Sequence, residues 1–367
     1  MKKLTFIIVA MCLYSCQNNS KHLYPSPDVD NITYFEDMQM PEVENYQLQE
    51  LSTPEDNPNG AYFVYADTVL IVENFMGNPD HYLFTCYNLN TLDSIAGIIK
   101  MEDDSDEMIG DTPKFRNGNL DVHNVIDNTI YSLCVDSILK KKDEYKPYLT
   151  HIDDRICDFV FKGDTAIVSN ASYVNGFGVS PEVPNFISLS RETGQSFNKT
   201  VANQECFPGN ASARSICYNP KLDQYFEIWV SFPVINIYDN NFELIKQYKY
   251  RNHEDIIFEP KGEWNALMPK DYNFVYYFEY ACQTEKYFYV IANNIPTHEL
   301  SEGEDFTKQE IWCFDYDNNL KRRIKIKNPE FDDFLLSVNE QTGNIYLCGI
   351  TSEDGETFLY KLIKDDE

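Results

Sequence analysis

Cys16 is the residue whose side chain and position point most directly to a chemical reaction. Its thiol can be acylated on sulfur, and it follows Lys2, Lys3 and a mostly apolar run at residues 4–13. That run is too short to cross a bilayer core, which needs about 20 apolar residues. A short basic start followed by such a run is typical of a secretion signal. We therefore expect export of the chain, with Cys16 placed for lipid attachment.

The segment Leu13-Tyr14-Ser15-Cys16 resembles the bacterial lipobox, Leu-x-small-Cys. The resemblance implies that the cysteine is diacylated on sulfur, released by the lipoprotein signal peptidase and then acylated on its amino group. One myristoyl chain binds a membrane only marginally, whereas several chains together anchor a protein stably. We predict a signal peptide over residues 1–15 and lipidation of Cys16. The alternative is an ordinary secretory signal with a cysteine nearby.

Residues 16–32 are polar and contain Pro25 and Pro27, so we predict a flexible tether. Gln17, not an aspartate, follows the cysteine, and in lipoproteins generally this favours the outer membrane. Lipoproteins of Bacteroides-type bacteria that reach the cell exterior often carry acidic residues just after the cysteine. The first acidic residue here is Asp28, so we expect the periplasmic face of the outer membrane rather than the cell surface.

The formal net charge of −29 limits the partners of this chain. A surface of that sign repels nucleic acid and anionic lipid, so we exclude nucleic-acid partners. Binding of a cation or a basic partner is one interpretation of the charge. Solubility alone is the simpler interpretation, and we favour it.

Eight cysteines follow Cys16, without a CxxC motif and without His and Cys at spacings typical of zinc sites. Cys206 and Cys217 flank a loop with Pro, Gly and Ser, and we treat them as a candidate disulfide. Four others lie in apolar strand patterns and are expected to be small buried residues: Cys86, Cys134, Cys313 and Cys348.

The sequence predicts that most of the chain forms short strands. Aromatic residues make up 14% of the chain, and turn-forming residues occur in short clusters. A turn residue followed by an alternating apolar strand recurs six times, at Asp67, Asn128, Asp164, Asp223, Glu285 and Gly343. Downstream of most copies, a strand, a polar turn and another strand follow, which is the pattern of a hairpin.

Repeated units of four short strands predict an all-β fold, a six-bladed β-propeller over residues 33–367. Seven blades, or a different β-repeat fold, remain alternatives. Residues 46–51 are expected to complete the last blade and so remove an exposed edge. The lipobox, the tether and the six units together resemble the TolB-like six-bladed propeller lipoproteins of Bacteroides-type bacteria, many of which have no known function.

Three segments suggest metal binding or a special turn, and each has a simpler interpretation. The acidic run at residues 102–107 suits Ca²⁺, which prefers carboxylate oxygens, but it is interpreted as a solvated loop. Residues 315–319 begin like a calcium loop without its later glycine and glutamate, so we predict a hairpin corner. Residues 352–358 approach an Asp-box turn and are interpreted as a turn. We predict no metal site.

Motifs for nucleophilic catalysis, zinc proteolysis and phosphate binding are missing from the sequence. A propeller brings distant residues together at its central mouth, where His123, His151 and Arg155 are candidates for convergence. We assign no catalytic residue and no cofactor. Our hypothesis is non-enzymatic binding or scaffolding of a protein or glycan, at a membrane to which Cys16 anchors the chain. The alternatives are a Ca²⁺-dependent propeller hydrolase or lyase with carboxylates near the axis, and a sensor-linked or adhesive surface protein.

Overall fold

The computed structural model shows an all-β chain. It describes residues 21–22, 29–54, 60–74, 82–100, 110–116, 118–124, 128–152, 156–170, 186–193, 195–200, 214–251, 257–261, 266–269, 275–296, 309–327, 329, 331, 333–351 and 356–365. Helical structure in these ranges is limited to α2 (Val135–Lys141) and two 3₁₀ turns, η1 (Phe35–Asp37) and η2 (Lys142–Glu144). None of these helices is long and apolar enough to cross a bilayer.

Antiparallel pairing groups most of the described strands into six units of four. Unit 1 contains β4 (Ala61–Tyr65), β5 (Val69–Glu73), β6 (Tyr82–Asn88) and β7 (Ser94–Lys100). Unit 2 contains β8 (Gly110–Arg116), β9 (Asn119–Asn124), β10 (Thr129–Cys134) and β11 (Tyr148–His151). Unit 3 contains β12 (Ile156–Lys162), β13 (Thr165–Asn170), β14 (Phe186–Ser190) and β15 (Ser196–Thr200).

The second half of the chain forms the other three units. Unit 4 contains β16 (Arg214–Asn219), β17 (Gln224–Trp229), β18 (Val234–Tyr238) and β19 (Leu244–Lys249). Unit 5 contains β22 (Val275–Gln283), β23 (Tyr287–Pro296), β24 (Glu310–Asp315) and β25 (Leu320–Ile326). Unit 6 contains β26 (Asp333–Asn339), β27 (Asn344–Ile350), β28 (Thr357–Lys364) and, from the other end of the chain, β3 (Val43–Leu51).

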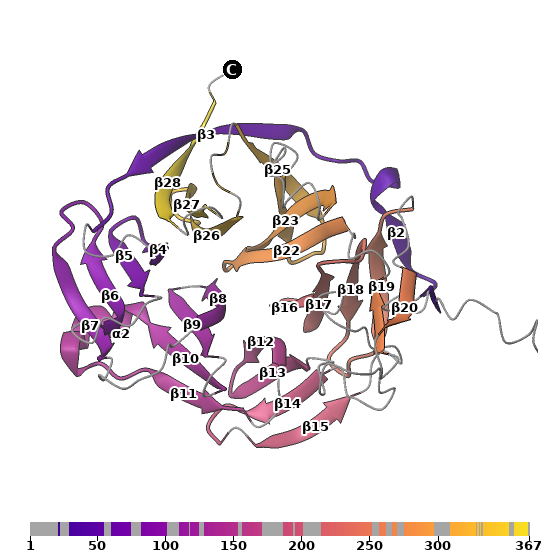
Figure 1. The fold of residues 1–367 in the computed structure, drawn as a ribbon, viewed down its shortest axis with the longest axis horizontal. Coiled ribbons are helices and arrows are strands. Elements are labelled where there is room, and N and C mark those ends of the chain that lie inside the picture. Colours follow the sequence, from indigo (N-terminus) through magenta and orange to yellow (C-terminus); the bar gives the residue numbers. More distant parts are fainter. Residues whose placement is uncertain are drawn as a thin grey trace, which may run out of the picture.

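The units form a propeller-like ring in which first strands such as β8, β16 and β22 lie toward the centre (Figure 1). β3 closes the ring. It pairs antiparallel with β28, from Leu51 opposite Leu359 to Tyr46 opposite Lys364, and parallel with β25. This confirms that residues 46–51 cover the edge of the last unit. A second amino-terminal strand, β2 (Ile32–Tyr34), extends unit 4 by pairing parallel with β19.

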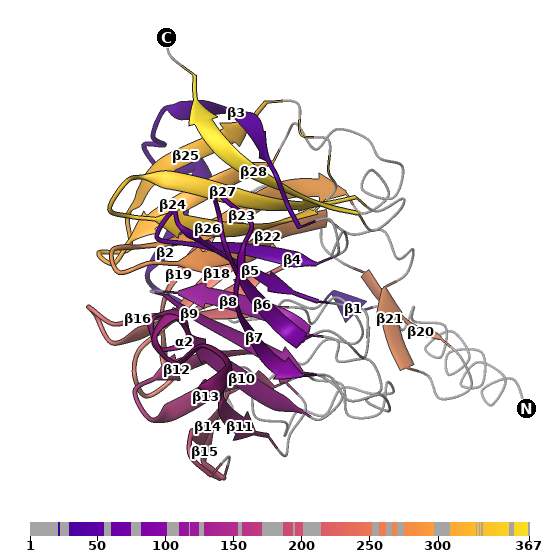
Figure 2. The same ribbon diagram turned by 90° about the vertical axis from the view of Figure 1, so that its left-hand side faces the viewer.

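A small three-stranded sheet lies outside the six units. It contains β1 (Lys21–His22), β20 (Ile257–Lys261) and β21 (Ala266–Pro269). β20 and β21 form an antiparallel hairpin between units 4 and 5, and β1 pairs with β20. Two residues of the segment expected to be a tether therefore add to the edge of this hairpin (Figure 2).

The apolar core lies between neighbouring units. Each junction around the ring has its own cluster of buried residues. At the junction of units 4 and 5, for example, the rings of Phe226 and Phe288 have centroids 4.4 Å apart. At the junction of units 6 and 1, Tyr346 and Tyr62 belong to one cluster. Inner strands therefore bury both faces, as in β5, where all five residues are buried, whereas outer strands such as β25 keep exposed positions.

Five of the six repeat markers identified in the sequence fall at the start of the second strand of a unit. Asp67, for instance, follows Ala66 in a hairpin turn where both residues have positive φ, 58° and 49°. The exception is Asn128, which precedes β10, the third strand of unit 2. The equivalent turn in unit 2 is at Gly118, where φ is +73°. This offset explains the irregular spacing of the second marker.

The strand cysteines are small core residues, with one exception. Cys86, Cys313 and Cys348 are buried, as the sequence pattern predicts. Burial raises the pKa of the Cys86 thiol to about 12, so this thiol is unreactive at neutral pH. Cys134 is only half-buried, because it ends β10 and precedes α2.

Candidate functional site

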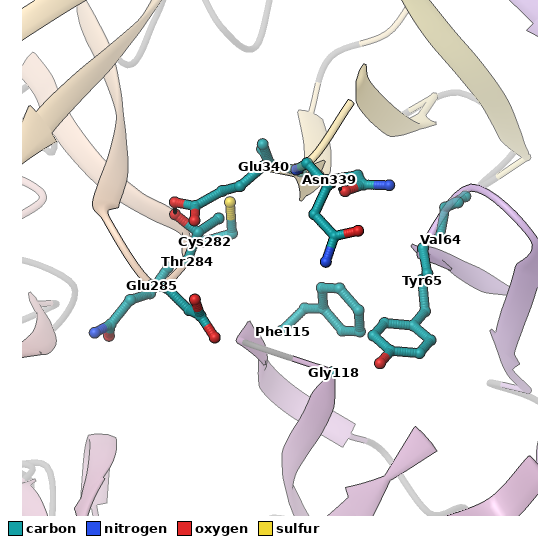
Figure 3. A pocket seen from close by; sticks show the side chains of 13 residues that line it. Val64, Tyr65, Phe115, Gly118, Cys282, Thr284, Glu285, Asn339 and Glu340 are labelled. Atoms are coloured by element: carbon teal, nitrogen blue, oxygen red, sulfur yellow. Dashed lines mark hydrogen bonds between the residues drawn. The ribbon is translucent and has the colours of Figure 1, made fainter. Parts of the chain in front are cut away.

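A pocket lies at the axis of the ring, where the first strands end. Its volume is about 190 Å³, and it is lined by the ends of first strands and the turns that follow them in units 1, 2, 5 and 6. Figure 3 shows side chains from these separate units around one hollow. We call the end of the ring that carries these turns the pocket face.

One wall of the pocket is aromatic. Phe115 and Tyr65 contact each other edge to face, with ring centroids 6.5 Å apart. The Tyr65 hydroxyl donates a hydrogen bond of 3.0 Å to Asp136 on α2, which fixes the ring. Gly118 is required beside it, since its φ is positive and a Cβ there would lie 2.7 Å from the Tyr65 ring. A larger residue at position 118 would therefore deform this wall.

The facing wall is polar. The Thr284 hydroxyl and the Lys286 amide both donate to Oε1 of Glu340, the latter at 2.9 Å. These bonds join the turn of unit 5 to the turn of unit 6. Figure 3 shows Thr284 and Glu340 side by side on this wall. Asn339 shapes the second turn, because its Oδ1 accepts the Gln341 amide at 3.0 Å. The pocket thus combines hydrogen-bond acceptors on one side with an aromatic surface on the other.

Gln283 lies at the base of the polar wall and connects units 4 and 5. Its side-chain amide donates to the Tyr218 carbonyl at 2.8 Å and to the Tyr316 hydroxyl at 2.7 Å. The Cys217 thiol donates to its Oε1 at 3.3 Å. Its backbone also pairs, parallel and across the axis, with Arg116 of β8. These contacts hold the turn of β22 in place beside the pocket.

Deeper in the ring, Lys114 joins four first strands. Its ammonium group donates to Asp158 Oδ2 and to the Ile216 carbonyl, each at 2.6 Å. It also lies 4.2 Å from the centroid of the Tyr280 ring, a cation–π contact. The four residues come from β8, β12, β16 and β22. Because Lys114 and Asp158 are both buried, protein side chains fill the axis at this level.

Asp158 is held by more than the lysine. Oδ2 accepts the Ile216 amide at 2.6 Å, and Oδ1 accepts the Phe159 amide at 2.7 Å. Burial raises the pKa of Asp158, while Lys114 and the two amides act in the opposite direction. Oδ2 therefore has a charged and a neutral donor and Oδ1 has a neutral one, which is the arrangement of a structural ion pair.

A second buried ion pair lies within unit 4. Arg214 Nε is 3.3 Å from Glu227 Oε1. Glu227 Oε2 accepts hydrogen bonds of 2.9 Å from Trp229, Asn236 and Tyr238. With three neutral donors and a guanidinium around it, this carboxylate is also structural.

Glu73, at the end of β5, is a buried carboxyl group of a different kind. Both of its oxygens are buried, and neither receives a hydrogen bond from a described residue. Burial raises the pKa of Glu73 to about 8. It lies at the end of the ring opposite the pocket face, because β5 runs away from the β4–β5 turn.

The histidines proposed to converge do not meet at the mouth of the ring. His123 is on β9, and its Nε2 lies 2.9 Å from Asn128 Oδ1. His151 is on β11, the outermost strand of unit 2, and its Nδ1 lies 2.7 Å from the Thr129 hydroxyl. Both belong to unit 2 but to strands other than the axial strand β8, and Arg155 lies outside the described residues.

The acidic segments divide into a confirmed turn and two untested ones. Asp315 Oδ1 accepts the amides of Asp317 and Asn319, at 3.0 Å and 2.8 Å, as expected for a hairpin corner. Residues 102–107 and most of 352–358 lie outside the described residues. Among the described residues, no group of three or more His, Cys, Asp or Glu side chains is arranged to hold a metal ion.

The predicted modification sites stay predictions. Cys16 lies outside the described residues, as does Cys206. Cys217 is buried in β16, where its thiol contacts Gln283 as described above. The pairing of Cys206 with Cys217 is therefore untested.

No protein-family model and no curated protein sequence matches the chain. Solved structures are nevertheless similar in fold. A candidate exported protein from Bacteroides fragilis is 10% identical, with a TM-score of 0.52, over 92% of this chain and 100% of that one. A member of the DUF4221 family from Bacteroides vulgatus is 9% identical, with a TM-score of 0.50, over 89% of this chain and 100% of that one. At such identities the similarity establishes the fold alone.

The pocket residues were not identified from the sequence, although a signal for them exists. Tyr65, Phe115, Gln283 and Asn339 each lie at or next to the end of a first strand, and the repeat markers follow shortly after most of these positions. The residues just before the markers at Asp67, Glu285 and Gly343 include Tyr65, Gln283 and Asn339, whereas Phe115 has no marker after it because the marker of unit 2 is offset to Asn128.

Proposed function

We propose that this chain is a lipid-anchored, six-bladed β-propeller of the outer membrane that binds a protein or glycan at the pocket face, without catalysing a reaction. Two features support the blade count: the six four-stranded units, and a separate apolar cluster at each of the six junctions. β3 supports closure, since one blade made from both ends of the chain removes the last free edge.

The observation that carries the binding role is the construction of the pocket from four units. Its volume of about 190 Å³ is smaller than the ~300–1,000 Å³ typical of small-molecule sites. A wider hollow of about 500 Å³, lined by Lys221, Lys286 and Asp317, lies beside it on the same face, and Glu285 lines both. The two hollows together suit part of a large partner, such as a protruding side chain or a sugar unit.

The chemistry of the pocket sets the kind of group that it would receive. The carboxylates of Glu285 and Glu340 supply oxygens that can accept hydrogen bonds from a ligand, and Phe115 and Tyr65 offer an aromatic surface. A hydroxyl-rich sugar ring, or a basic side chain of a protein, can donate hydrogen bonds to the carboxylates and also pack against the aromatic surface. The same proposal includes attachment through Cys16, which rests on the lipobox. It also includes a position at the periplasmic face of the outer membrane, which rests on the residues after the lipobox.

The proposal is tested by capture of an envelope partner with a photoreactive amino acid at the exposed Lys286, which lines the wider hollow next to Glu285. Gln341→Trp fills the pocket rim and should abolish capture, as well as binding to any glycan found on an array. Glu192→Trp, at an exposed turn of unit 3 that does not line the pocket, should leave both unchanged. Capture that survives Gln341→Trp, or hydrolysis of a glycan or lactone by the purified protein that is lost with Gln341→Trp, would contradict a pocket-based binding role.

A further inference from the structure

The pairing of β1 with the β20–β21 hairpin fixes where the amino-terminal segment leaves the ring. Lys21 pairs with Phe258, and His22 pairs with Ile257. The hairpin itself lies between the last strand of unit 4, β19, and the first strand of unit 5, β22. Figure 2 shows β1, β20 and β21 together on one side of the ring.

That side is opposite the pocket face. In each unit the four strands alternate in direction, so the fourth strand ends at the same face where the next first strand begins. The first strands end at the pocket face. A hairpin inserted between β19 and β22 therefore extends from the other end of the ring, which we call the hairpin face.

The distance from the hairpin to Cys16 is short. Four residues separate Cys16 from Lys21. Even fully extended, this segment spans at most about 18 Å from Cα to Cα. The seven residues of β27 run from one face to the other and span about 20 Å from the first Cα to the last. The segment is thus too short for Cys16 to reach from the hairpin around to the pocket face.

We propose that the hairpin face of the ring lies against the membrane and that the pocket face points away from it. This inference rests on the proposed lipidation of Cys16, and it adds the orientation of the binding surface. The pairing of β1 with β20 makes the hairpin the point from which acyl chains extend. The large partner of the pocket face would then approach from the aqueous side, without competition from lipid headgroups.

Fluorescence energy transfer to a headgroup-labelled lipid tests the orientation. A fluorescent amino acid is introduced in the acylated chain either at Glu356 or at Gln341, which are exposed residues at opposite ends of β27. In vesicles, the label at position 356 should show at least about twofold more transfer than the label at 341, because the two differ in height by about the length of the strand. Equal transfer, or more transfer from position 341, would overturn the orientation.

Two insertions separate the role of the β1–β20 pairing from that of the anchor. A flexible insertion of about ten residues after Ser20 lengthens the segment between Cys16 and β1, and should reduce the difference between the two labels. The same insertion after Pro25 lies beyond β1 and should preserve it. If both insertions act alike, the pairing does not set the orientation. If the chain carries no acyl label and does not float with vesicles, both the lipid anchor and the orientation are wrong. If the chain is acylated but the two labels show equal transfer, only the orientation is wrong.

Discussion

Lys114 and Asp158 form a buried ion pair at the centre of the ring, with Nζ 2.6 Å from Oδ2. The two residues are 44 positions apart and lie on β8 and β12. Their partners Ile216 and Tyr280 bring β16 and β22 to the same point. One side chain thus connects four of the six units at the axis.

Lys114→Met should lower the free energy of unfolding by about 3–5 kcal/mol, because it leaves the Asp158 carboxylate buried without its cation. Lys221→Met is the matched control. Lys221 and Asp317 are also 2.6 Å apart but are more than half exposed, so this loss should be at most about 1 kcal/mol. Urea denaturation at neutral pH measures both.

The double variant Lys114→Met, Asp158→Asn checks the cause of that loss. The asparagine side chain would keep an acceptor for the Ile216 amide while removing the buried charge. We expect the double variant to be more stable than Lys114→Met alone. A double variant that is less stable than either single variant would show that the pair does not act through charge compensation.

Glu73 should make the protein less stable as pH rises. Its pKa is about 8 in the folded chain, against an ordinary value of 4.5. Between these values the folded state holds a proton that the unfolded state has lost, so stability falls with rising pH, by up to about 1.4 kcal/mol per pH unit. Glu73→Gln should remove this slope between pH 5 and 8, whereas Glu356→Gln, at an exposed position, should not. If the free energy of unfolding changes with pH in the same way for wild type and Glu73→Gln, this prediction is wrong.

Glu44 should stabilise the closure of the ring. It lies on β3 and forms two hydrogen bonds with Arg322 of β25, at 2.8 Å and 3.1 Å, and one with Lys364 of β28, at 3.0 Å. The Arg322 guanidinium is the main reason that its pKa is lowered to about 2. Glu44→Gln should cost about 1–2 kcal/mol at neutral pH, allowing for partial solvent screening.

The effect of Glu44 has a defined pH dependence. Because its folded pKa is lowered, the stabilisation is complete above about pH 4.5, the ordinary value, and is lost as pH falls toward 2. Thermal melts from pH 7 to pH 3 should therefore converge for wild type and Glu44→Gln. Glu50→Gln, exposed on the same strand, should behave like wild type throughout.

Local patterns in the sequence predicted the elements well, because turns and strand alternation are local properties. Asp67 and Gly343 mark hairpins, and residues 46–51 close the ring. The marker at Asn128 precedes the third strand because unit 2 has a turn residue with positive φ at both Gly118 and Asn128, 73° and 53°. Such local patterns do not predict contacts between residues that are far apart in the sequence. Thr284 and Glu340 come together only when the ring closes, as do Lys114 and Asp158.

We propose that Cys16 holds the chain at a membrane. The direct test is labelling of cells with an alkyne fatty acid, followed by fractionation, for wild type, Cys16→Ala and Cys12→Ala. Cys12 lies in the apolar run before the lipobox and serves as the matched control. Cys16→Ala should lose the acyl label and leave the membrane fraction, while Cys12→Ala should keep the label and stay with the membrane. A Cys16→Ala chain that still carries the label and stays with the membrane would contradict the proposal.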